Sequence, residues 1–255
     1  MKILVSNDDG INAPGIHAMA KALSTIGEVT VVAPALQQTA KGHSLTFGGE
    51  LRVQKRPFEE GIEAYAVWGT PKDCVDLAVE ALLDFTPDLI VTGINEGPNI
   101  CNDAVSSGTI GGAVAGYNKH IPSIAASLDF GDIYDYEKCA PVVAQVASWF
   151  ARQPYNREFA LSINFPNTLE PFKGITVAES GGKHIFDMQY EKVREDEDSV
   201  YYFVRGGKLR LENIVEDLDH DIYALQQGYV VLTPVNDDLV HTDYLDTVRK
   251  DWNNR

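Results

Sequence analysis

The sequence is poor in cysteine and contains no long uninterrupted apolar run. Its three cysteines, Cys74, Cys101 and Cys139, lie far apart and form no Cys-x-x-Cys pair. A disulfide framework or a zinc site is therefore disfavoured, and a reducing compartment such as the cytoplasm is expected. No window approaches the ~18 consecutive apolar residues of a membrane-spanning helix. The opening MKILVSNDDG is too short in its apolar part for a secretory signal, and we expect it to form a strand.

Positive charge is also scarce. The chain has 21 Lys and Arg residues against 37 Asp and Glu residues, which gives a formal net charge of -16. Binding to long nucleic acid is disfavoured, because such binding depends on clustered basic side chains. A small phosphate ester is still compatible with this charge, since a bound cation can reverse the field at a single site.

Strand-like and helix-like segments alternate from residue 1 to about residue 130. Short apolar runs separated by helical periodicity predict an α/β fold, with a mostly parallel sheet covered by helices on both faces. The predicted strands are Lys2–Ser6, Val29–Ala33, Leu89–Thr92 and Ser123–Ser127. The predicted helices cover Ile16–Ile26, a segment beginning at Thr70-Pro71-Lys72-Asp73, Ile110–Tyr117 and Val142–Phe150. Thr70 is expected to cap the second of these helices, with Asp73 three residues later.

The second half of the chain has a different pattern. Two further segments, Phe159–Asn164 and Ile175–Ala178, could extend the sheet. After them we expect a charged, solvated loop over Glu191–Asp198 and a projecting β-hairpin that turns at Gly206-Gly207. A terminal helix is predicted over Leu239–Trp252. Because no Gly-, Ser- or Pro-rich linker is present, we expect one domain over 1–255, with a core of about 1–180 and an accessory region of about 181–255.

Two neighbouring acids follow the first predicted strand, in Asn7-Asp8-Asp9-Gly10. Adjacent carboxylates at the end of a buried strand are costly to ionise unless a cation or hydrogen-bond donors satisfy them. Mg²⁺ and Mn²⁺ prefer carboxylate, amide and water oxygens. The motif therefore favours a metal site, although Asn-Asp-Asp-Gly is also a good turn sequence.

Other polar residues follow neighbouring strands at the same expected edge of the sheet. Asn95, which follows the strand over Leu89–Thr92, could supply a neutral oxygen ligand or simply cap a turn. The loop after Pro34 contains Thr39, Gly42 and His43, and it could face the same crevice or be an ordinary polar loop.

A fourth element is Ser106-Ser107-Gly108-Thr109, directly before the Gly- and Ala-rich helix. Free backbone N–H groups at a helix start, flanked by hydroxyls and an unobstructed glycine, can hold an anion such as phosphate. Simple capping by a hydroxyl is the alternative.

Taken together, these motifs resemble the stationary-phase survival protein family, the SurE nucleotidases. The matching segments are SNDDG-INAPG, VVAP with a later SLT, WGTPKDCV, PDLIVTGINEGPN, SSGTIGGAVAGY, INFP and GYVVLTPVNDDL. They cover nearly the whole chain in the family's order. The resemblance implies a Rossmann-like core and a metal-dependent phosphatase of nucleoside 5′-monophosphates, with 3′-monophosphates as further substrates. It also implies one Mg²⁺ or Mn²⁺ per subunit and a homodimer, and a tetramer is left open.

The resemblance also implies roles for individual residues. Asp8, Asp9 and Asn95 match the family's metal ligands, and Thr39 stands at the position of its serine ligand. Asp8 and Asp9 are also the expected catalytic residues. The expected phosphate and substrate contacts are Asn7, Gly42, His43, Asn95, Ser106, Ser107, Gly108 and Thr109.

This chain departs from the family at several of these positions. Ala40 replaces a glycine, Ser106 replaces a tyrosine, and the helix Ile110–Tyr117 lacks the glutamate that the family often has. The reaction type is unaffected by these changes, whereas base preference and rate stay open. Either water or the Asp8 carboxylate could attack phosphorus, and we favour water because a carboxylate committed to a metal is a poorer nucleophile.

Three other readings fit less well. A non-catalytic, Mg²⁺-binding receiver-like signalling module needs a phosphorylatable Asp after a later strand, where this chain offers Asn95 and Ser127. A haloacid-dehalogenase-like phosphatase needs Asp-x-Asp rather than adjacent acids. A dinucleotide dehydrogenase needs a Gly-x-Gly-x-x-Gly turn after the first strand.

Overall fold

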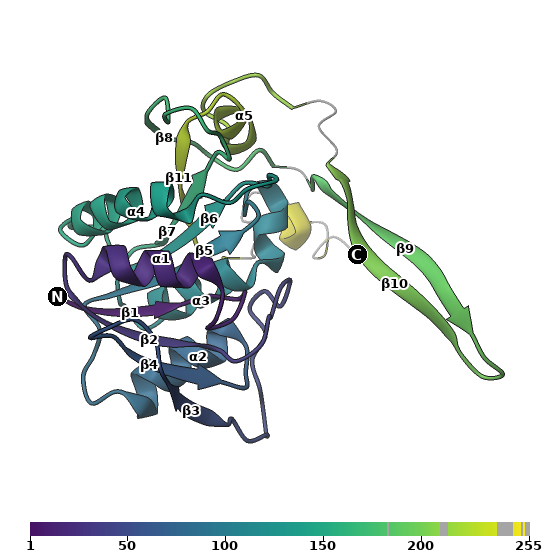
Figure 1. Cartoon of the computed structure of the whole chain (residues 1–255). Coiled ribbons are helices and arrows are strands. Elements are labelled where there is room, and N and C mark those ends of the chain that lie inside the picture. The colour runs from purple at the N-terminus through teal and green to yellow at the C-terminus, as the bar shows by residue number, and fades with distance from the viewer. Residues whose placement is uncertain (183, 210–213, 239–246, 251, 253–255) are drawn as a thin grey trace.

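A computed structural model describes residues 1–182, 184–209, 214–238, 247–250 and 252. Its centre is a nine-stranded, mostly parallel sheet in the order β3-β4-β2-β1-β5-β6-β7-β11-β8 (Figure 1). The strands are β1 Lys2–Ser6, β2 Glu28–Pro34, β3 Val53–Arg56, β4 Glu63–Val67, β5 Leu89–Glu96, β6 Ser123–Leu128, β7 Ala160–Phe165, β8 Ile175–Val177 and β11 Val230–Val235. β3 runs antiparallel to β4, and β11 runs antiparallel to β7.

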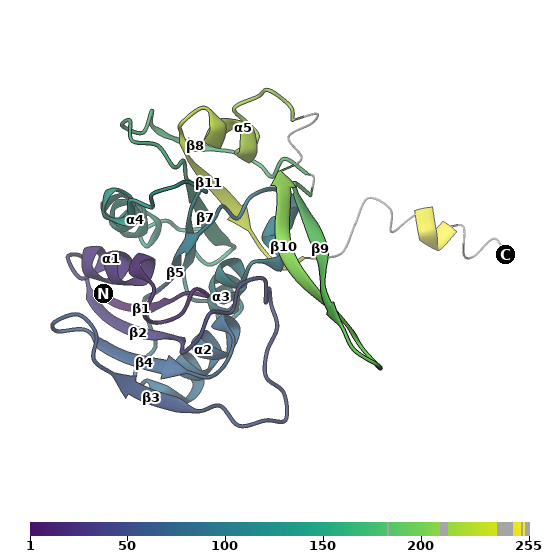
Figure 2. The same ribbon diagram turned by 45° about the vertical axis from the view of Figure 1, so that its right-hand side comes forward.

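Helices cover both faces of this sheet, so the predicted three-layer α/β fold is confirmed. The α-helices are α1 Pro14–Leu23, α2 Pro71–Leu77, α3 Gly108–Tyr117, α4 Tyr136–Phe150 and α5 Asp221–Gln226. A short π-helical segment, Ala78–Leu82, extends α2, and a 3₁₀ helix, Cys101–Ser106, precedes α3. Figure 2 shows α1 and α4 on one face of the sheet and α2 and α3 on the other. None of the helices in the described residues is long and apolar enough to cross a lipid bilayer.

The first strand shows how the sequence specifies these layers. Successive side chains of a strand point to opposite faces. Ile3 and Val5 pack in the cluster formed with α1 and α4, whereas Leu4 packs in the cluster formed with α2. All three side chains are fully buried. An uninterrupted apolar strand is therefore required here, because both faces of the sheet are covered.

The order of the strands places a crevice at the end of β1. β1 pairs with β2 on one side and with β5 on the other, both in parallel. The connection from β1 leads to β2, and the chain later returns to the opposite side of β1, so the strand order reverses there. Ligands of open α/β sheets bind at such reversals, beyond the carboxyl ends of the strands.

A projecting hairpin is present as predicted, but its turn lies at a different place in the sequence. β9, Phe186–Glu195, pairs antiparallel with β10, Val200–Leu209, and the two strands project from the body (Figures 1 and 2). The turn therefore lies within 196–199, and Gly206 belongs to β10, where it pairs with Met188. Most of the expected loop Glu191–Asp198 is strand. Its residues through Glu195 belong to β9 and are all exposed, so the charged side chains solvate a strand rather than a loop.

Several elements could not be read from the sequence, or end elsewhere than expected. The short strands β3 and β4, the helix α5 and the strand β11 were not predicted, and α4 begins six residues before its expected start at Val142. Pro141 lies in the second turn of α4, and the helix begins earlier at an N-cap, Asp135, whose side chain accepts from Lys138 N. The expected terminal helix Leu239–Trp252 lies mostly outside the described residues, of which 247–250 are helical.

Candidate metal and phosphate site

Asp8 is a buried carboxylate that touches the start of α3. Only 2% of its surface is exposed. The Thr109 hydroxyl donates a hydrogen bond to Asp8 Oδ1 over 2.5 Å. A Cβ on Gly108 would come within 2.8 Å of Asp8 Cβ, so this helix position must be glycine for the contact to form. The end of β1 and the first turn of α3 therefore meet at a single carboxylate.

Asp9 lies beside the end of β5. Its Oδ2 accepts a hydrogen bond from the Glu96 N–H over 3.1 Å. Burial, followed by the Asp8 and Glu96 charges, raises the pKa of Asp9 to about 7, although hydrogen bonds from the Glu96 N–H and the Gln37 side chain oppose the rise. Burial also raises the pKa of Asp8, against the lowering effect of the Thr109 hydrogen bond. The protein alone thus provides too little positive charge for both acids.

Two asparagines bring amide oxygens to the same edge. Asn95 is buried, and its Nδ2 donates to Gly97 O over 2.7 Å, which orients the amide and leaves Oδ1 as its acceptor atom. Asn7 donates from Nδ2 to Gly10 O over 2.8 Å. Its Oδ1 is buried and has no hydrogen-bond partner. A buried polar atom without a partner is uncommon and costly.

These groups fit a hard divalent cation. The carboxylates of Asp8 and Asp9 and the amide of Asn95 offer oxygen atoms, the ligand type that Mg²⁺ and Mn²⁺ prefer. A cation would also offset the cost of two neighbouring buried charges. Within the described residues no three His, Cys, Asp or Glu side chains gather as a metal-binding group. A cation at this edge would therefore depend on neutral oxygens in addition to the acid pair.

The start of α3 has the features of an anion site. Ser107 is the N-cap, and its hydroxyl accepts from the Ile110 N–H over 3.1 Å. The helix dipole favours negative charge at this end, and the N–H groups of Gly108 and Thr109 already face the Asp8 carboxylate. Ser106 is exposed, and its hydroxyl donates to Asp103 O over 2.8 Å.

The loop after β2 runs along both halves of the site. Gln38 N–H donates to Asp8 O over 2.6 Å, and Gly42 N–H donates to Ser106 O over 2.9 Å. A Cβ on Gly111 would lie 2.2 Å from Gly42 O, so the loop packs directly on α3. Thr39 is exposed, and no hydrogen bond links its hydroxyl to the acids in the part of the chain described. Ala40 has a φ of 59°, a conformation that favours glycine.

The structure therefore brings together most of the predicted residues. Asp8, Gly108 and Thr109 are in contact, Asp9 lies beside the strand end that carries Asn95, and Gly42 contacts Ser106. His43 lines a cavity together with Val105 and Ile110, beside the start of α3. Sequence reasoning missed Gln37 and Glu96, which bind Asp9. Glu96 acts through its backbone N–H, which no side-chain pattern reveals.

Comparisons with known proteins identify the family of this chain. A family model described as survival protein SurE matches residues 3–187. The 5′-nucleotidase SurE of Carboxydothermus hydrogenoformans is 39% identical over 219 residues, which covers 84% of this chain and 83% of the relative. The 5′/3′-nucleotidase SurE of Cronobacter sakazakii is 43% identical over 188 residues, 73% of this chain and 72% of the relative.

A solved structure extends the similarity to the whole fold. The SurE protein from Aquifex aeolicus superposes with a TM-score of 0.81 at 32% sequence identity, covering 98% of this chain and 99% of the other. The family model that matches most of the chain, the relative 39% identical to it and the superposition of the whole fold lead to one conclusion: the chain belongs to the SurE family.

Proposed function

We propose that this protein is a divalent-metal-dependent phosphatase that hydrolyses nucleoside 5′-monophosphates to nucleoside and phosphate, with 3′-monophosphates as further substrates. One observation carries the proposal. Asp8 belongs to the acid pair and also accepts a hydrogen bond from Thr109 at the start of α3, so a cation site and an anion site adjoin. The relatives named as 5′-nucleotidase and 5′/3′-nucleotidase support the nucleotide as substrate.

Four residues would hold one Mg²⁺ or Mn²⁺: Asp8, Asp9, Asn95 and, through its hydroxyl, Thr39. When bound, the cation would neutralise charge on the phosphate oxygens and make a neighbouring water more acidic. Asp8 and Asp9 would present their carboxylates to the cation in fixed orientations, because the Thr109 hydroxyl binds the first and the Glu96 N–H binds the second.

The start of α3 would bind the phosphate. The N–H groups of Gly108 and Thr109, which also face Asp8, and the Ser107 hydroxyl would donate to the oxygens on which charge accumulates. The Ser106 hydroxyl would join them by giving up its hydrogen bond to Asp103 O. These donors belong to a helix that is held in place by Gly108 against Asp8 and by Gly111 against Gly42. Asn7, Gly42 and His43 complete the proposed substrate contacts.

Water is the favoured nucleophile. Asp8 is almost fully buried and bound by Thr109, so its carboxylate has little freedom to approach phosphorus in line with the leaving group. Treating the enzyme with borohydride during turnover should leave Asp8 unlabelled, and recovery of the reduced product of a phosphoaspartate at Asp8 would establish the other route.

The test of the proposed function is a phosphate-release screen. Each nucleoside 5′- and 3′-monophosphate is incubated with the protein in EDTA and after addition of Mg²⁺ or Mn²⁺. We expect release only with a cation and with at least one nucleotide. Release in EDTA would contradict the metal requirement, and no release under any condition would contradict the function. A receiver-like module would release no phosphate from nucleotides under any condition.

The surroundings of this site are also proposed. Three buried cysteines without disulfides support a cytoplasmic location. β8 and β11 lie in the same sheet as β1, which supports a single domain over 1–255. The hairpin exposes apolar side chains far from the core, which supports a homodimer or tetramer formed through it. These side chains are Met188, Tyr190, Val193, Val200, Tyr201, Tyr202, Phe203 and Val204.

A further inference from the structure

Asp221 is a buried carboxylate outside the proposed metal and phosphate site. It is the first residue of α5, and only 2% of its surface is exposed. Its Oδ1 accepts hydrogen bonds from the Gly181 N–H over 2.9 Å and from the Ile222 N–H over 2.7 Å. Its Oδ2 accepts a hydrogen bond from the Cys101 N–H over 2.8 Å. One carboxylate therefore joins α5, the loop at Gly181 and the start of the 3₁₀ helix Cys101–Ser106.

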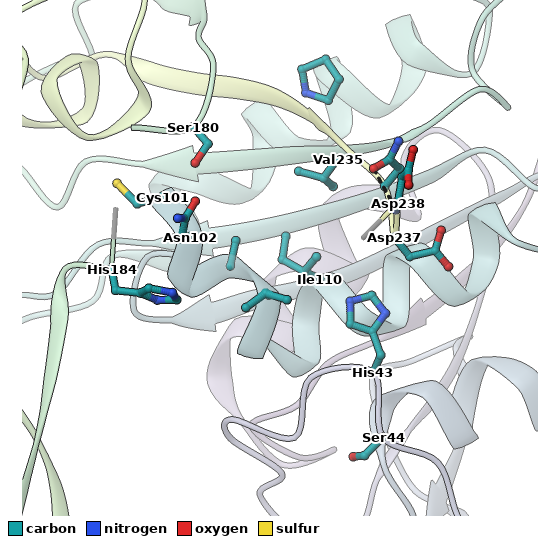
Figure 3. A pocket seen from close by; sticks show the side chains of 14 residues that line it. His43, Ser44, Cys101, Asn102, Ile110, Ser180, His184, Val235, Asp237 and Asp238 are labelled. Atoms are coloured by element: carbon teal, nitrogen blue, oxygen red, sulfur yellow. Dashed lines mark hydrogen bonds between the residues drawn. The ribbon is translucent and has the colours of Figure 1, made fainter. Parts of the chain in front are cut away.

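These three segments pack closely around the carboxylate. A Cβ on Gly181 would lie 3.0 Å from Cys101 Sγ and 3.3 Å from Asp221 Oδ1, so a larger residue there would push its neighbours apart. Cys101 Sγ lies 3.5 Å from Asp221 Oδ1. Burial, followed by the Asp221 charge, raises the pKa of the Cys101 thiol to about 12, so the thiol keeps its proton and donates it to the carboxylate. Figure 3 shows Cys101 and Ser180 at one end of the cavity beside α3 and His43 at the other.

The backbone of Cys101 has a conformation that needs such support. Its φ is 53°, in the left-handed region that residues with a Cβ rarely adopt. A conformation of this kind persists only where the surrounding structure fixes it. The Asp221 carboxylate binds both the N–H and the thiol of Cys101. Asp221 therefore fixes the direction in which the 3₁₀ helix begins.

The 3₁₀ helix leads directly into the proposed phosphate site. It ends at Ser106, and the next residue, Ser107, is the N-cap of α3. The Ser107 N–H donates to Ala104 O over 3.1 Å, which joins the 3₁₀ helix to α3 without an intervening loop. A change of direction at Cys101 would therefore move the first turn of α3.

The chain on the other side of Cys101 is anchored separately. Asn99 donates from its N–H to Asn164 Oδ1 and from its Nδ2 to Ser127 Oγ, both over 2.8 Å. Ser127 lies in β6 and Asn164 lies in β7, so the segment that follows β5 is tied to the sheet. A displacement at Cys101 should therefore reach α3 and should affect the proposed metal ligand Asn95, in β5, much less.

We propose that Asp221 is a positioning residue for the proposed phosphatase reaction. By holding Cys101 in its left-handed conformation, it places the first turn of α3 where that turn can bind a phosphate group. The inference rests on the proposed function. Asp221 is separated from Cys101 by 120 positions, and it acts through the 3₁₀ helix rather than by contact with the phosphate.

Variants of Asp221 test this role. Asp221→Asn keeps the shape of the side chain but replaces one acceptor oxygen with a donor, and Asp221→Ala removes both acceptors. We expect the affinity for inorganic phosphate, measured by isothermal titration calorimetry in Mg²⁺, to fall about five-fold or more, and further in Asp221→Ala. The affinity for Mn²⁺ alone, measured by electron paramagnetic resonance, should change less than about two-fold. Asp219→Asn removes the same charge from an exposed position and should match wild type.

Variants of Cys101 test the same geometry while Asp221 stays in place. A β-branched residue strongly disfavours the left-handed conformation, whereas glycine adopts it freely. Phosphate affinity should therefore be about three-fold or more weaker in Cys101→Val than in Cys101→Gly. In the Asp221→Asn background, Cys101→Gly should restore part of the phosphate affinity, and Cys101→Ala, which also removes the thiol but keeps Cβ, should not. Each affinity is measured at a temperature at which circular dichroism shows the variant to be folded.

The outcomes separate this role from a general loss of structure. Unchanged phosphate affinity in folded variants of Asp221, or equal affinity in Cys101→Val and Cys101→Gly, would overturn the proposal. A loss of Mn²⁺ affinity as large as that of phosphate affinity would also overturn it. If wild type binds no phosphate at millimolar concentrations, the proposal fails whether or not nucleotides are hydrolysed. The expected pattern of phosphate affinities, without hydrolysis of any nucleotide by wild type, would instead contradict the proposed function alone.

Discussion

Asp9 is the residue at which the proposed metal site can be tested most directly. Asp9→Asn keeps the shape of the side chain and its hydrogen bond from Glu96 N–H, and it removes one of the two charges that face the cation. We expect phosphate release to fall by roughly 10²-fold or more, with an unchanged circular dichroism spectrum. Retention of most activity would contradict the metal assignment.

The same variant predicts a pH effect on the stability of the metal-free protein. Burial first, and then the Asp8 charge, raise the pKa of Asp9 to about 7 in the folded state. The folded state thus holds this proton more tightly than the unfolded chain, where the pKa is about 3.9. Stability from this group is present below about pH 4 and is lost as the pH rises to 7.

Denaturant unfolding in EDTA measures this loss. Relative to Asp9→Asn, wild type should lose about 2–4 kcal/mol of unfolding free energy between pH 4 and pH 8. Above pH 7 the free energy of unfolding of Asp9→Asn, relative to that of wild type, should therefore be higher than at pH 4. A difference that stays constant over this range would show that Asp9 titrates normally.

Ala40 adopts a backbone conformation that carries a structural cost. Its φ of 59° lies in the left-handed region, which disfavours residues with a Cβ by roughly 1–2 kcal/mol. Ala40→Gly removes that strain, although the greater freedom of glycine in the unfolded chain offsets about 0.4–1 kcal/mol. We expect a net gain of up to about 1 kcal/mol, measured as a rise in Tm of a few degrees.

Much of the site was predictable at this scale because strand ends converge in a parallel sheet. Asp8, Asp9 and Asn95 follow strands that were evident from their apolar runs, and Thr109 opens a helix that was evident from its composition. The contacts of Gln37 and Glu96 with Asp9 were not predictable, because they depend on loop conformation and on a backbone N–H. The exposure of Thr39 is likewise a property of the loop and not of the residue type.

The start of α2 has the capping box that its sequence predicts. Thr70 and Asp73 form the expected capping box. Asp73 also accepts hydrogen bonds from the N–H and the hydroxyl of Thr46, both over 2.8 Å. The signature identified the helix start, whereas the second partner comes from 27 residues earlier and has no local signal.

Asp73→Ala should therefore cost more than the loss of a cap. It leaves donors of Thr46 and Thr70 without their acceptor, and we expect about 2–3 kcal/mol of lost stability in urea unfolding. Asp76→Ala, on the same helix, removes a half-exposed side chain paired with Lys72 and Lys119 and should cost about 1 kcal/mol or less. Equal losses in the two variants would contradict the role assigned to Asp73.

The lowered pKa of Asp73 predicts how the stability of the protein changes in acid. Burial acts to raise the pKa of Asp73, but the hydrogen bonds from Thr70 and Thr46 outweigh it, so the pKa lies below its usual value. This stabilisation is present at neutral pH and is lost only as the pH falls below about 4. The difference between Asp73→Ala and wild type should therefore shrink in strong acid.

The elements that escaped prediction did so for different physical reasons. β3 lies at the edge of the sheet and three of its four residues are exposed, so it lacks an apolar run. β4, between β3 and β2, has buried residues but is only five residues long. β11 enters the sheet between β7 and β8 through contacts that are distant in sequence. Gly206 was assigned to a turn because of its residue type, whereas strand pairing in the hairpin outweighs the low strand propensity of glycine.

For the whole molecule, the projecting hairpin predicts self-association. Tyr202 and Val204 lie on one face of β10 and are 57% and 46% exposed. Replacing both with Glu should lower the oligomeric state measured by sedimentation velocity, because two charges would have to be buried in an apolar contact. Tm of the core should change little, since neither residue belongs to a buried cluster. An unchanged oligomeric state would place the interface elsewhere.

The contact between Asp8 and Thr109 has a thermodynamic consequence for the two ligands. Because one carboxylate contacts both sites, a cation that draws charge from Asp8 alters the helix start at which the anion binds. If cation binding strengthens the affinity for inorganic phosphate by some factor, phosphate must strengthen the affinity for the cation by the same factor. Titrating each ligand in the presence and absence of the other would yield that factor twice, and Thr109→Val should bring it closer to one.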